Sequence, residues 1–285
     1  MKKILAVFDG TKYSEGASKY AIELAKATNS MLVGVFIYDT RYMNLAYAYS
    51  FDQPFIDFTA VENLEKGDAE KINLNIRLFD RACNDKGVHH KVHLDKGVPL
   101  QELLRESAFA DILIVDSHTG FSFPQSGEPN SFLKDLLADA HCPVLIVPHH
   151  YIYFDHAIIC YDGSPSSLYA LKMFAYLFPE LKDIETTIVS VNQYASNHLK
   201  DNSNLKELAN VHFGEVNYNV LHGDAPDELM IFLKQKEANY MVVMGAYGRS
   251  ALSRMFHQSI SKSRLFNITN NGTHFACIRT KVIIH

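Results

Sequence analysis

The sequence carries one ordered series of motifs twice, and this repeat constrains the fold more than any other feature. The paired segments are FDG at 8–10 with YDG at 161–163, DILIV at 111–115 with NYMVV at 239–243, and Ser117-x-x-Gly120 with Gly245-x-x-Gly248. A series that returns in the same order at a near-constant offset predicts two copies of one domain of about 140 residues. We place the first domain at residues 1–150 and the second at 151–285.

Within the first copy, short apolar runs alternate with helical patterns. The runs that are typical of buried parallel strands are 4–8, 32–37, 88–94, 112–115 and 144–147, and the helical patterns are 14–28, 61–84, 100–108 and 131–140. Alternation of this kind predicts βαβ units, and therefore an open parallel sheet with helices on both faces. The second copy begins again with an apolar run at 157–161, and we expect its last strand at 275–279. The aromatic segment 38–58 has no clear period and is predicted to be an extended loop.

Composition and charge exclude several classes of protein. The chain has 285 residues, with 27 basic against 32 acidic side chains and a net charge of −5, which disfavours a general nucleic-acid binder. No apolar run reaches the roughly 18–20 residues that a membrane span needs, and Asp9 interrupts the first apolar stretch too early for a signal peptide. The four cysteines (Cys83, Cys142, Cys160 and Cys277) are scattered, without CxxC pairs. We expect a cytoplasmic protein with reduced cysteines.

The predicted sheet points to a binding site, because ligands of open parallel sheets bind beyond the carboxyl ends of the strands. Asp9 and Asp162 each follow the first strand of a copy, and their carboxylates could accept hydrogen bonds from a ribose or a base. The loop from Gly245 to Gly248 precedes Arg249 and leads toward a predicted helix near Gln258 and Ser259. Glycines, arginines and a helix N-terminus are all suited to phosphate. The alternative is structural: each Asp-Gly pair and the G-x-x-G segment would serve only as turns.

These residues resemble those of the universal stress protein family. The resemblance rests on the strand followed by Asp-Gly, on MGAYGRSALSRMFHQS at 244–259 and on AHCPVLIVP at 140–148, and it covers the whole chain twice. It implies that each domain is a five-stranded, mostly parallel α/β sheet flanked by helices, of the Rossmann-like class that includes the adenine nucleotide alpha hydrolases. It also implies a cytoplasmic location and pairing through the last strand. In tandem members the two domains of one chain pair in this way, and a homodimer is a further alternative.

Many members of the family bind ATP through G-x-x-G, nine residues and then Gly-Ser or Gly-Thr, together with the Asp after the first strand. The resemblance therefore implies Asp162 and Gly163 on the sugar or base side, with Mg²⁺ if ATP binds. The phosphates would lie on Gly245, Gly248, Arg249, Gln258 and Ser259, although Gln258 replaces a glycine of the pattern. In the first copy Asp9 and Gly120 remain, but Asn130 replaces the glycine and Glu128 would repel phosphate. We do not expect ATP there.

The leading hypothesis is a regulatory, stress-response binding module with no catalytic residues. A nucleotide-free scaffold for dimerisation or partner docking is the alternative, and a slow ATP-hydrolysing enzyme is a weaker one because the sequence offers no general base. The histidines that cluster are His89, His90, His93, His149 and His150. They lack the other ligands of a zinc set, so no metal site is expected. The aromatic residues of 42–58 lack basic neighbours beyond Arg41 and favour a lid or interdomain packing over nucleic-acid stacking.

Overall fold

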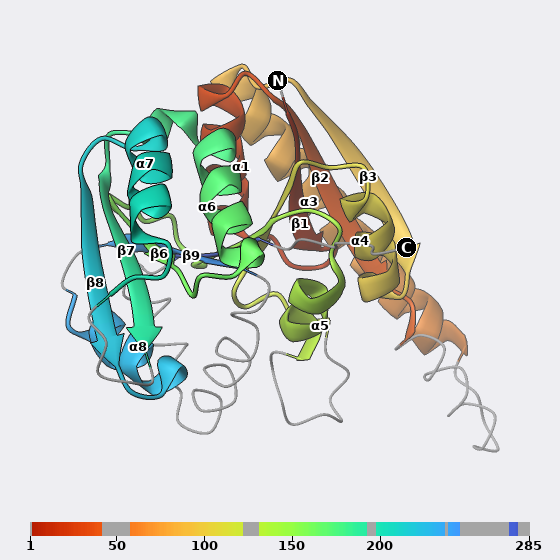
Figure 1. The fold of residues 1–285 in the computed structure, drawn as a ribbon. Coiled ribbons are helices and arrows are strands. Elements are labelled where there is room, and N and C mark those ends of the chain that lie inside the picture. Colours follow the sequence, from red (N-terminus) through yellow and green to blue (C-terminus); the bar gives the residue numbers. More distant parts are fainter. Residues whose placement is uncertain are drawn as a thin grey trace, which may run out of the picture. The chain divides into compact units, whose positions relative to one another are not determined.

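The computed structural model of the chain describes residues 2–41, 58–121, 131–192, 198–236, 239–245 and 274–278. The chain divides into two compact units, Met1–Asp139 and Ala140–His285. Each unit is a mostly parallel sheet flanked by helices (Figure 1). The α/β class predicted from the alternation of strands and helices is confirmed.

The first unit contains four parallel strands in the order β3-β2-β1-β4. Its elements are β1 (Lys3–Asp9), α1 (Glu15–Ala27), β2 (Met31–Asp39), α3 (Phe58–Lys86), β3 (His90–Gly97), α4 (Pro99–Ser107), β4 (Ile112–Asp116) and α5 (Ser131–Asp139). The chain winds outward from β1 to β3 and then returns to the other side of β1 for β4. Strand order therefore reverses between β1 and β4, and their carboxyl ends border the position where such sheets bind ligands.

The second unit repeats this winding. Its elements are β5 (Val144–Val147), β6 (His156–Cys160), α6 (Pro165–Leu177), η1 (Pro179–Leu181), β7 (Glu185–Asn192), α7 (Asn202–His212), β8 (Val216–His222), α8 (Ala225–Lys234), β9 (Tyr240–Gly245) and β10 (His274–Ile278). Five strands are parallel in the order β10-β9-β6-β7-β8, and β5 pairs antiparallel with β10. The reversal of strand order lies between β6 and β9.

Continuous apolar sequence explains the innermost strands. In the first unit β4 is buried at all five positions, and Phe8, Phe36 and Phe79 are at most 1% exposed. The ring of Phe8 stacks on that of Phe36 at 4.7 Å, and Phe79 meets both rings edge-on. Gly34 of β2 is required here because a methyl group at this position would lie 2.6 Å from the Phe79 ring. The core thus joins α3 to the sheet.

Two first-unit elements differ from their predicted bounds. The strand expected at 88–94 is found at His90–Gly97, because Gly87 turns the chain with a φ of +66° and the Val88 amide donates to Cys83. This strand lies at the edge of the sheet and is only half-buried, so it lacks the continuous apolar run of a central strand. The helix α3 extends the 61–84 prediction at both ends. Most of the aromatic loop falls at 42–57, outside the described residues.

Of the three cysteines whose side chains the structure describes, Cys83 and Cys142 are buried and Cys160 is partly buried. Cys83, Cys142 and Cys160 are free thiols, and burial raises the pKa of Cys83 and of Cys160 to about 12. Neither thiol is therefore a nucleophile at neutral pH. Within the ranges that the structure describes, we find no helix with the length and apolar character needed to span a bilayer.

Candidate functional site

The carboxyl ends of β6 and β9 bring three of the sequence-predicted site residues to one edge of the second unit. Asp162 and Gly163 follow β6, and Gly245 is the last residue of the neighbouring strand β9. A methyl group on Gly245 would lie 2.7 Å from the carbonyl carbon and oxygen of Ser166, so the end of β9 packs directly against the first turn of α6. Gly245 thus has a packing role that holds whether or not a ligand binds.

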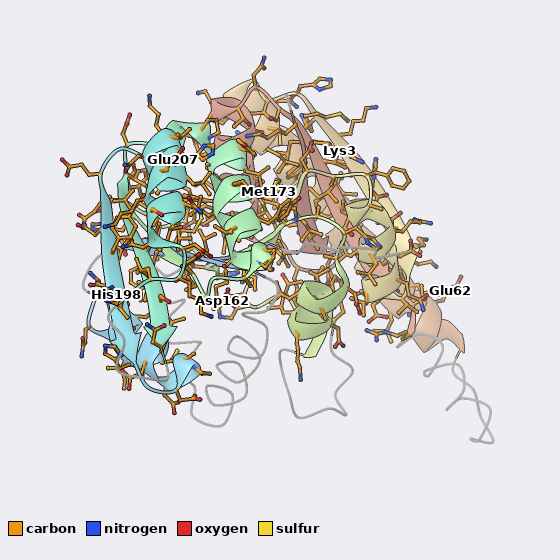
Figure 2. All side chains as sticks on the ribbon, in the orientation of Figure 1. Lys3, Glu62, Asp162, Met173, His198 and Glu207 are labelled. Carbon is orange, nitrogen blue, oxygen red and sulfur yellow. The ribbon has the colours of Figure 1, made fainter. Side chains whose placement is uncertain are left out.

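Asp162 presents an exposed carboxylate at this edge (Figure 2). One of its oxygens accepts a hydrogen bond of 2.8 Å from the backbone N–H of Ser164. Partial burial alone would raise the pKa of Asp162, but the hydrogen bonds from Ser164 and Ser167 outweigh it and hold the pKa below its ordinary value. The group is therefore ionised at neutral pH, and in the described part of the chain no cation lies within ion-pair distance of it.

The helix that follows is started by its own sequence. Ser164 caps α6 by accepting a hydrogen bond of 3.2 Å from the Ser167 N–H, and Pro165 occupies the first helical turn. Between Asp162 and this cap, Gly163 adopts a φ of +79°, a conformation that side chains other than glycine rarely take. The Asp-Gly-Ser sequence therefore turns the chain sharply, and one oxygen of the exposed Asp162 carboxylate bonds the Ser164 N–H of that turn.

In the first unit the equivalent aspartate is engaged by its own turn. One oxygen of Asp9 accepts from the Thr11 N–H at 3.0 Å and from the Thr11 hydroxyl at 2.9 Å. The other oxygen lies 3.7 Å from the Lys12 ammonium, and the Asp9 side chain is only 19% exposed. For Asp9 the structural alternative considered from the sequence, a turn residue that bonds its own backbone, describes these contacts.

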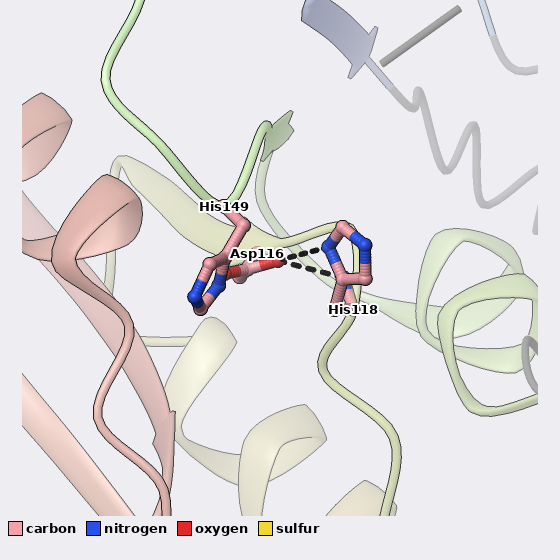
Figure 3. A group of neighbouring side chains, drawn as sticks. All are labelled: Asp116, His118 and His149. Carbon is pink, nitrogen blue, oxygen red and sulfur yellow. Dashed lines mark hydrogen bonds and ion pairs between the residues drawn. The ribbon is translucent and has the colours of Figure 1, made fainter. Parts of the chain in front are cut away.

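A second carboxylate at this edge of the first unit, that of Asp116, is also engaged in internal hydrogen bonds. Asp116 ends β4 with 2% exposure and accepts hydrogen bonds of 2.6 Å from the Ser14 hydroxyl and 2.7 Å from the His118 N–H. The His118 ring also contacts it, with Nδ1 at 3.2 Å (Figure 3). Ser14 in turn caps α1 by accepting from the Ala17 N–H at 3.1 Å. The corresponding residue in the repeat is Met244, the residue before the last of β9, so the two units differ in charge at this point.

The loop after β4 in the first unit is fixed by Arg41. The Arg41 guanidinium donates to both oxygens of Asp39, at 2.9 Å from Nε and 2.6 Å from Nη2, and Nη2 also donates to the Phe121 carbonyl at 2.7 Å. These bonds tie the residue after Gly120 to the end of β2. A guanidinium already paired with a carboxylate in this way offers less charge to a phosphate. In the described part of the first unit, Arg41 is therefore committed to Asp39 and to the Phe121 carbonyl.

Comparison with known proteins identifies the family. The family model described as the universal stress protein family matches residues 1–148. The chain belongs to the universal stress protein family. A curated universal stress protein of Methanocaldococcus jannaschii is 24% identical over 154 residues, covering 51% of this chain and 81% of that protein.

Solved universal stress protein structures share the fold of the whole chain. One from Archaeoglobus fulgidus aligns with a TM-score of 0.69 at 16% identity, covering 98% of this chain and 96% of the other. A second, from Pseudomonas aeruginosa and described as a putative universal stress protein, aligns with a TM-score of 0.54 at 13% identity, covering 98% and 93%. At such identities the likeness concerns the fold alone. The shared fold spans both units of this universal stress protein.

Four of the site residues predicted from the sequence lie in a part of the chain that the structure does not describe. Gly248, Arg249, Gln258 and Ser259 fall outside the described residues. Conversely, two residues at the carboxyl edges were not recognised in the sequence. A comparison of the two copies could have revealed Asp116. An acidic residue follows the apolar run at 112–115, whereas the corresponding residue in the second copy is the apolar Met244. Lys200, which contacts the turn at Asp162, lies in no motif and gave no signal.

Proposed function

We propose that this universal stress protein binds an adenine nucleotide, ATP with Mg²⁺, in its second domain, which we place at residues 151–285. The proposal rests on one observation: the Asp162 carboxylate is exposed and ionised beyond the carboxyl end of β6, whereas the side chain of its counterpart Asp9 is only 19% exposed and lies 3.7 Å from the Lys12 ammonium. An ionised carboxylate at a reversal of strand order is suited to accept hydrogen bonds from ribose hydroxyls or from an adenine amino group.

The remaining contacts of the proposed site follow from the family pattern. Asp162 and Gly163 would face the sugar or base. The phosphates would lie on Gly245, Gly248, Arg249, Gln258 and Ser259, where backbone N–H groups, a guanidinium and a hydroxyl supply donors. Mg²⁺ would neutralise part of the phosphate charge. We propose a regulatory rather than catalytic role, because binding and orientation are all that these groups supply without a general base.

The central test is a calorimetric titration of the full chain with Mg-ATP, repeated on the variants Asp162→Ala and Asp9→Ala. We expect one binding site in the native chain and a loss of about 10- to 100-fold in affinity in Asp162→Ala, which corresponds to removing a hydrogen bond to a charged group. Asp9→Ala is the matched control and should leave the affinity unchanged. Two sites in the native chain, or equal losses in both variants, would contradict the assignment.

The lowered pKa of Asp162 predicts how this binding depends on pH. A carboxylate whose pKa is depressed in the folded protein is charged above that pKa and loses its contribution only as the pH falls through it. The ratio of adenosine affinities between native chain and Asp162→Asn should therefore stay constant between about pH 5 and 8, well above the ordinary aspartate pKa. Taking the ratio removes the effect of histidines that titrate in this range. A ratio that shrinks toward pH 5 would show that Asp162 takes up a proton there.

The nucleotide-free scaffold remains the second candidate because the first unit favours it. There, Asp116 and Arg41 are committed to internal bonds at the edge where a ligand would bind. If millimolar Mg-ATP produces neither heat nor thermal stabilisation of the full chain, the stabilisation that binding must give is missing. That result would favour a scaffold in which both domains serve dimerisation or protein partners.

A further inference from the structure

A short segment of the second unit, residues 198–201, lies over the turn formed by Asp162 and Gly163. We name it the latch. It follows β7 and leads into α7, and Figure 2 places His198 and Asp162 at the same edge of the unit. Three hydrogen bonds fix it there: Asn192 Nδ2 donates to the His198 carbonyl at 3.3 Å, the Tyr161 hydroxyl to the Lys200 carbonyl at 3.1 Å, and Lys200 Nζ to the Asp162 carbonyl at 3.0 Å.

The side chain of Lys200 covers Gly163 directly. A methyl group on Gly163 would overlap Cδ of Lys200, and it would lie 3.0 Å from Cβ and 3.3 Å from Cγ of the same side chain. The aliphatic stem of Lys200 therefore fills the space above the α-carbon of Gly163. A sugar or base that contacts the turn over Gly163 would need this same space. Lys200 and such a ligand cannot both occupy it.

The latch is held weakly enough to open. Lys200 is exposed, and its ammonium donates a hydrogen bond to the Asp162 carbonyl. Within the described ranges, no carboxylate oxygen lies within 4.0 Å of this ammonium. Fixing a lysine side chain costs conformational entropy comparable to what one exposed hydrogen bond returns. The next residue, Asp201, is the N-cap of α7 and has a φ of +48°, in the left-handed region. Buried Leu199, at 8% exposure, anchors the segment, so opening involves Lys200, whose carbonyl and ammonium are each held by one hydrogen bond.

We propose that Lys200 competes with the ligand for the Asp162–Gly163 turn, so that the latch must open before the turn can receive a sugar or base. This inference rests on the proposed nucleotide function for its ligand, but the closed latch itself does not. A site that is open in only a fraction of molecules binds with an affinity reduced by that fraction. The device therefore sets the nucleotide concentration at which the second domain responds.

Two variants release the latch at different anchors. Lys200→Ala removes the stem and the bond to Asp162, and Tyr161→Phe removes only the hydroxyl that holds the Lys200 carbonyl. Both should speed amide hydrogen exchange several-fold in residues 198–204, and Lys200→Ala should also speed it in 162–164. Both should strengthen adenosine and Mg-ATP binding by about two- to tenfold, the range for one lost hydrogen bond. Lys206→Ala is the matched control, because Lys206 lies on α7 over the Tyr218 ring, 5.4 Å from its centroid, and should change neither measurement.

The outcomes separate the latch from the nucleotide function. Unchanged exchange in Lys200→Ala would show that the latch is not closed in solution and would overturn the proposal. Weaker binding in Lys200→Ala would also overturn it, because Lys200 would then be a ligand contact. If neither adenosine nor Mg-ATP binds to the native chain or to any variant, the proposed nucleotide function fails and competition with a nucleotide fails with it. Faster exchange in that case would still establish the closed latch as a structural feature.

Discussion

Replacing Gly245 by alanine is expected to destabilise the second unit by about 2–3 kcal/mol, the usual cost of forcing an extra carbon into a close-packed site. The new methyl group would lie 2.7 Å from the Ser166 carbonyl carbon and oxygen and 2.8 Å from the Ser167 nitrogen. These are backbone atoms of α6, so no side-chain rotation can relieve the overlap. The first turn of α6 or the end of β9 must move instead.

The same displacement should reach the proposed nucleotide site. The moved turn contains the Ser164 cap and begins two residues after Asp162, so Gly245→Ala should weaken Mg-ATP binding even if the methyl group never touches the ligand. Peptide-resolved hydrogen exchange measures the structural effect, and we expect faster exchange in α6 and β9 with no change in β1 or α1.

A matched glycine elsewhere serves as the control. Gly67 lies inside α3, and a methyl group there would have no heavy atom within 4 Å. Gly67→Ala should therefore stabilise the protein by about 0.5–1 kcal/mol, because alanine loses less backbone entropy in a helix than glycine. If Gly245→Ala were equally harmless, β9 would not pack closely against α6. The packing role that we assign to Gly245 would then be wrong.

The parts of the fold that were predicted from the sequence are those coded locally. The central strands β1 and β4 are continuous apolar runs, and α1 begins immediately after the Ser14 cap, as the pattern at 14–28 indicates. The predicted bounds of the edge strand β3 are wrong by a few residues, because its half-buried, polar sequence does not mark where the preceding turn ends and the strand begins. Periodicity locates an element well where one side is fully buried and poorly where both sides meet solvent.

The candidate site shows more clearly which contacts cannot be predicted from sequence patterns. The sequence placed Asp162, Gly163 and Gly245 at one edge because strand ends are visible in the pattern. The sequence pattern does not distinguish Asp9 from Asp162, although Asp9 is less exposed and is paired with Lys12 while Asp162 is exposed. The latch was not predicted because Lys200 meets Asp162 from 38 residues away, in a segment without apolar period. Contacts of this kind are set by tertiary packing.

Among these non-local contacts, the hydrogen bond from the Ser14 hydroxyl to the Asp116 carboxylate has the largest expected effect on stability. It spans 102 residues and joins the start of α1 to the end of β4. We expect Asp116→Ala to destabilise the first unit by about 2–4 kcal/mol, because the Ser14 hydroxyl and the His118 N–H lose their acceptor where water does not replace it. Asp116→Asn keeps one carbonyl acceptor and should cost less, about 1 kcal/mol. Ser14→Ala, which removes a helix cap as well as the donor, should cost about 1–2 kcal/mol.

A double-mutant cycle on Ser14→Ala and Asp116→Asn isolates the bond, and we expect a coupling of about 1–2 kcal/mol from urea denaturation, with exchange confined to β1, α1 and β4. The opposite result is conceivable on physical grounds, because burying a carboxylate is itself costly. If Asp116→Ala stabilises the chain, the hydrogen bonds do not outweigh that cost. In either case Asp116→Ala should not create a second ATP site, since Asp9 stays bonded to Thr11 and Arg41 stays paired with Asp39. A second calorimetric site in this variant would show that the Asp116 carboxylate alone keeps nucleotide out of the first domain.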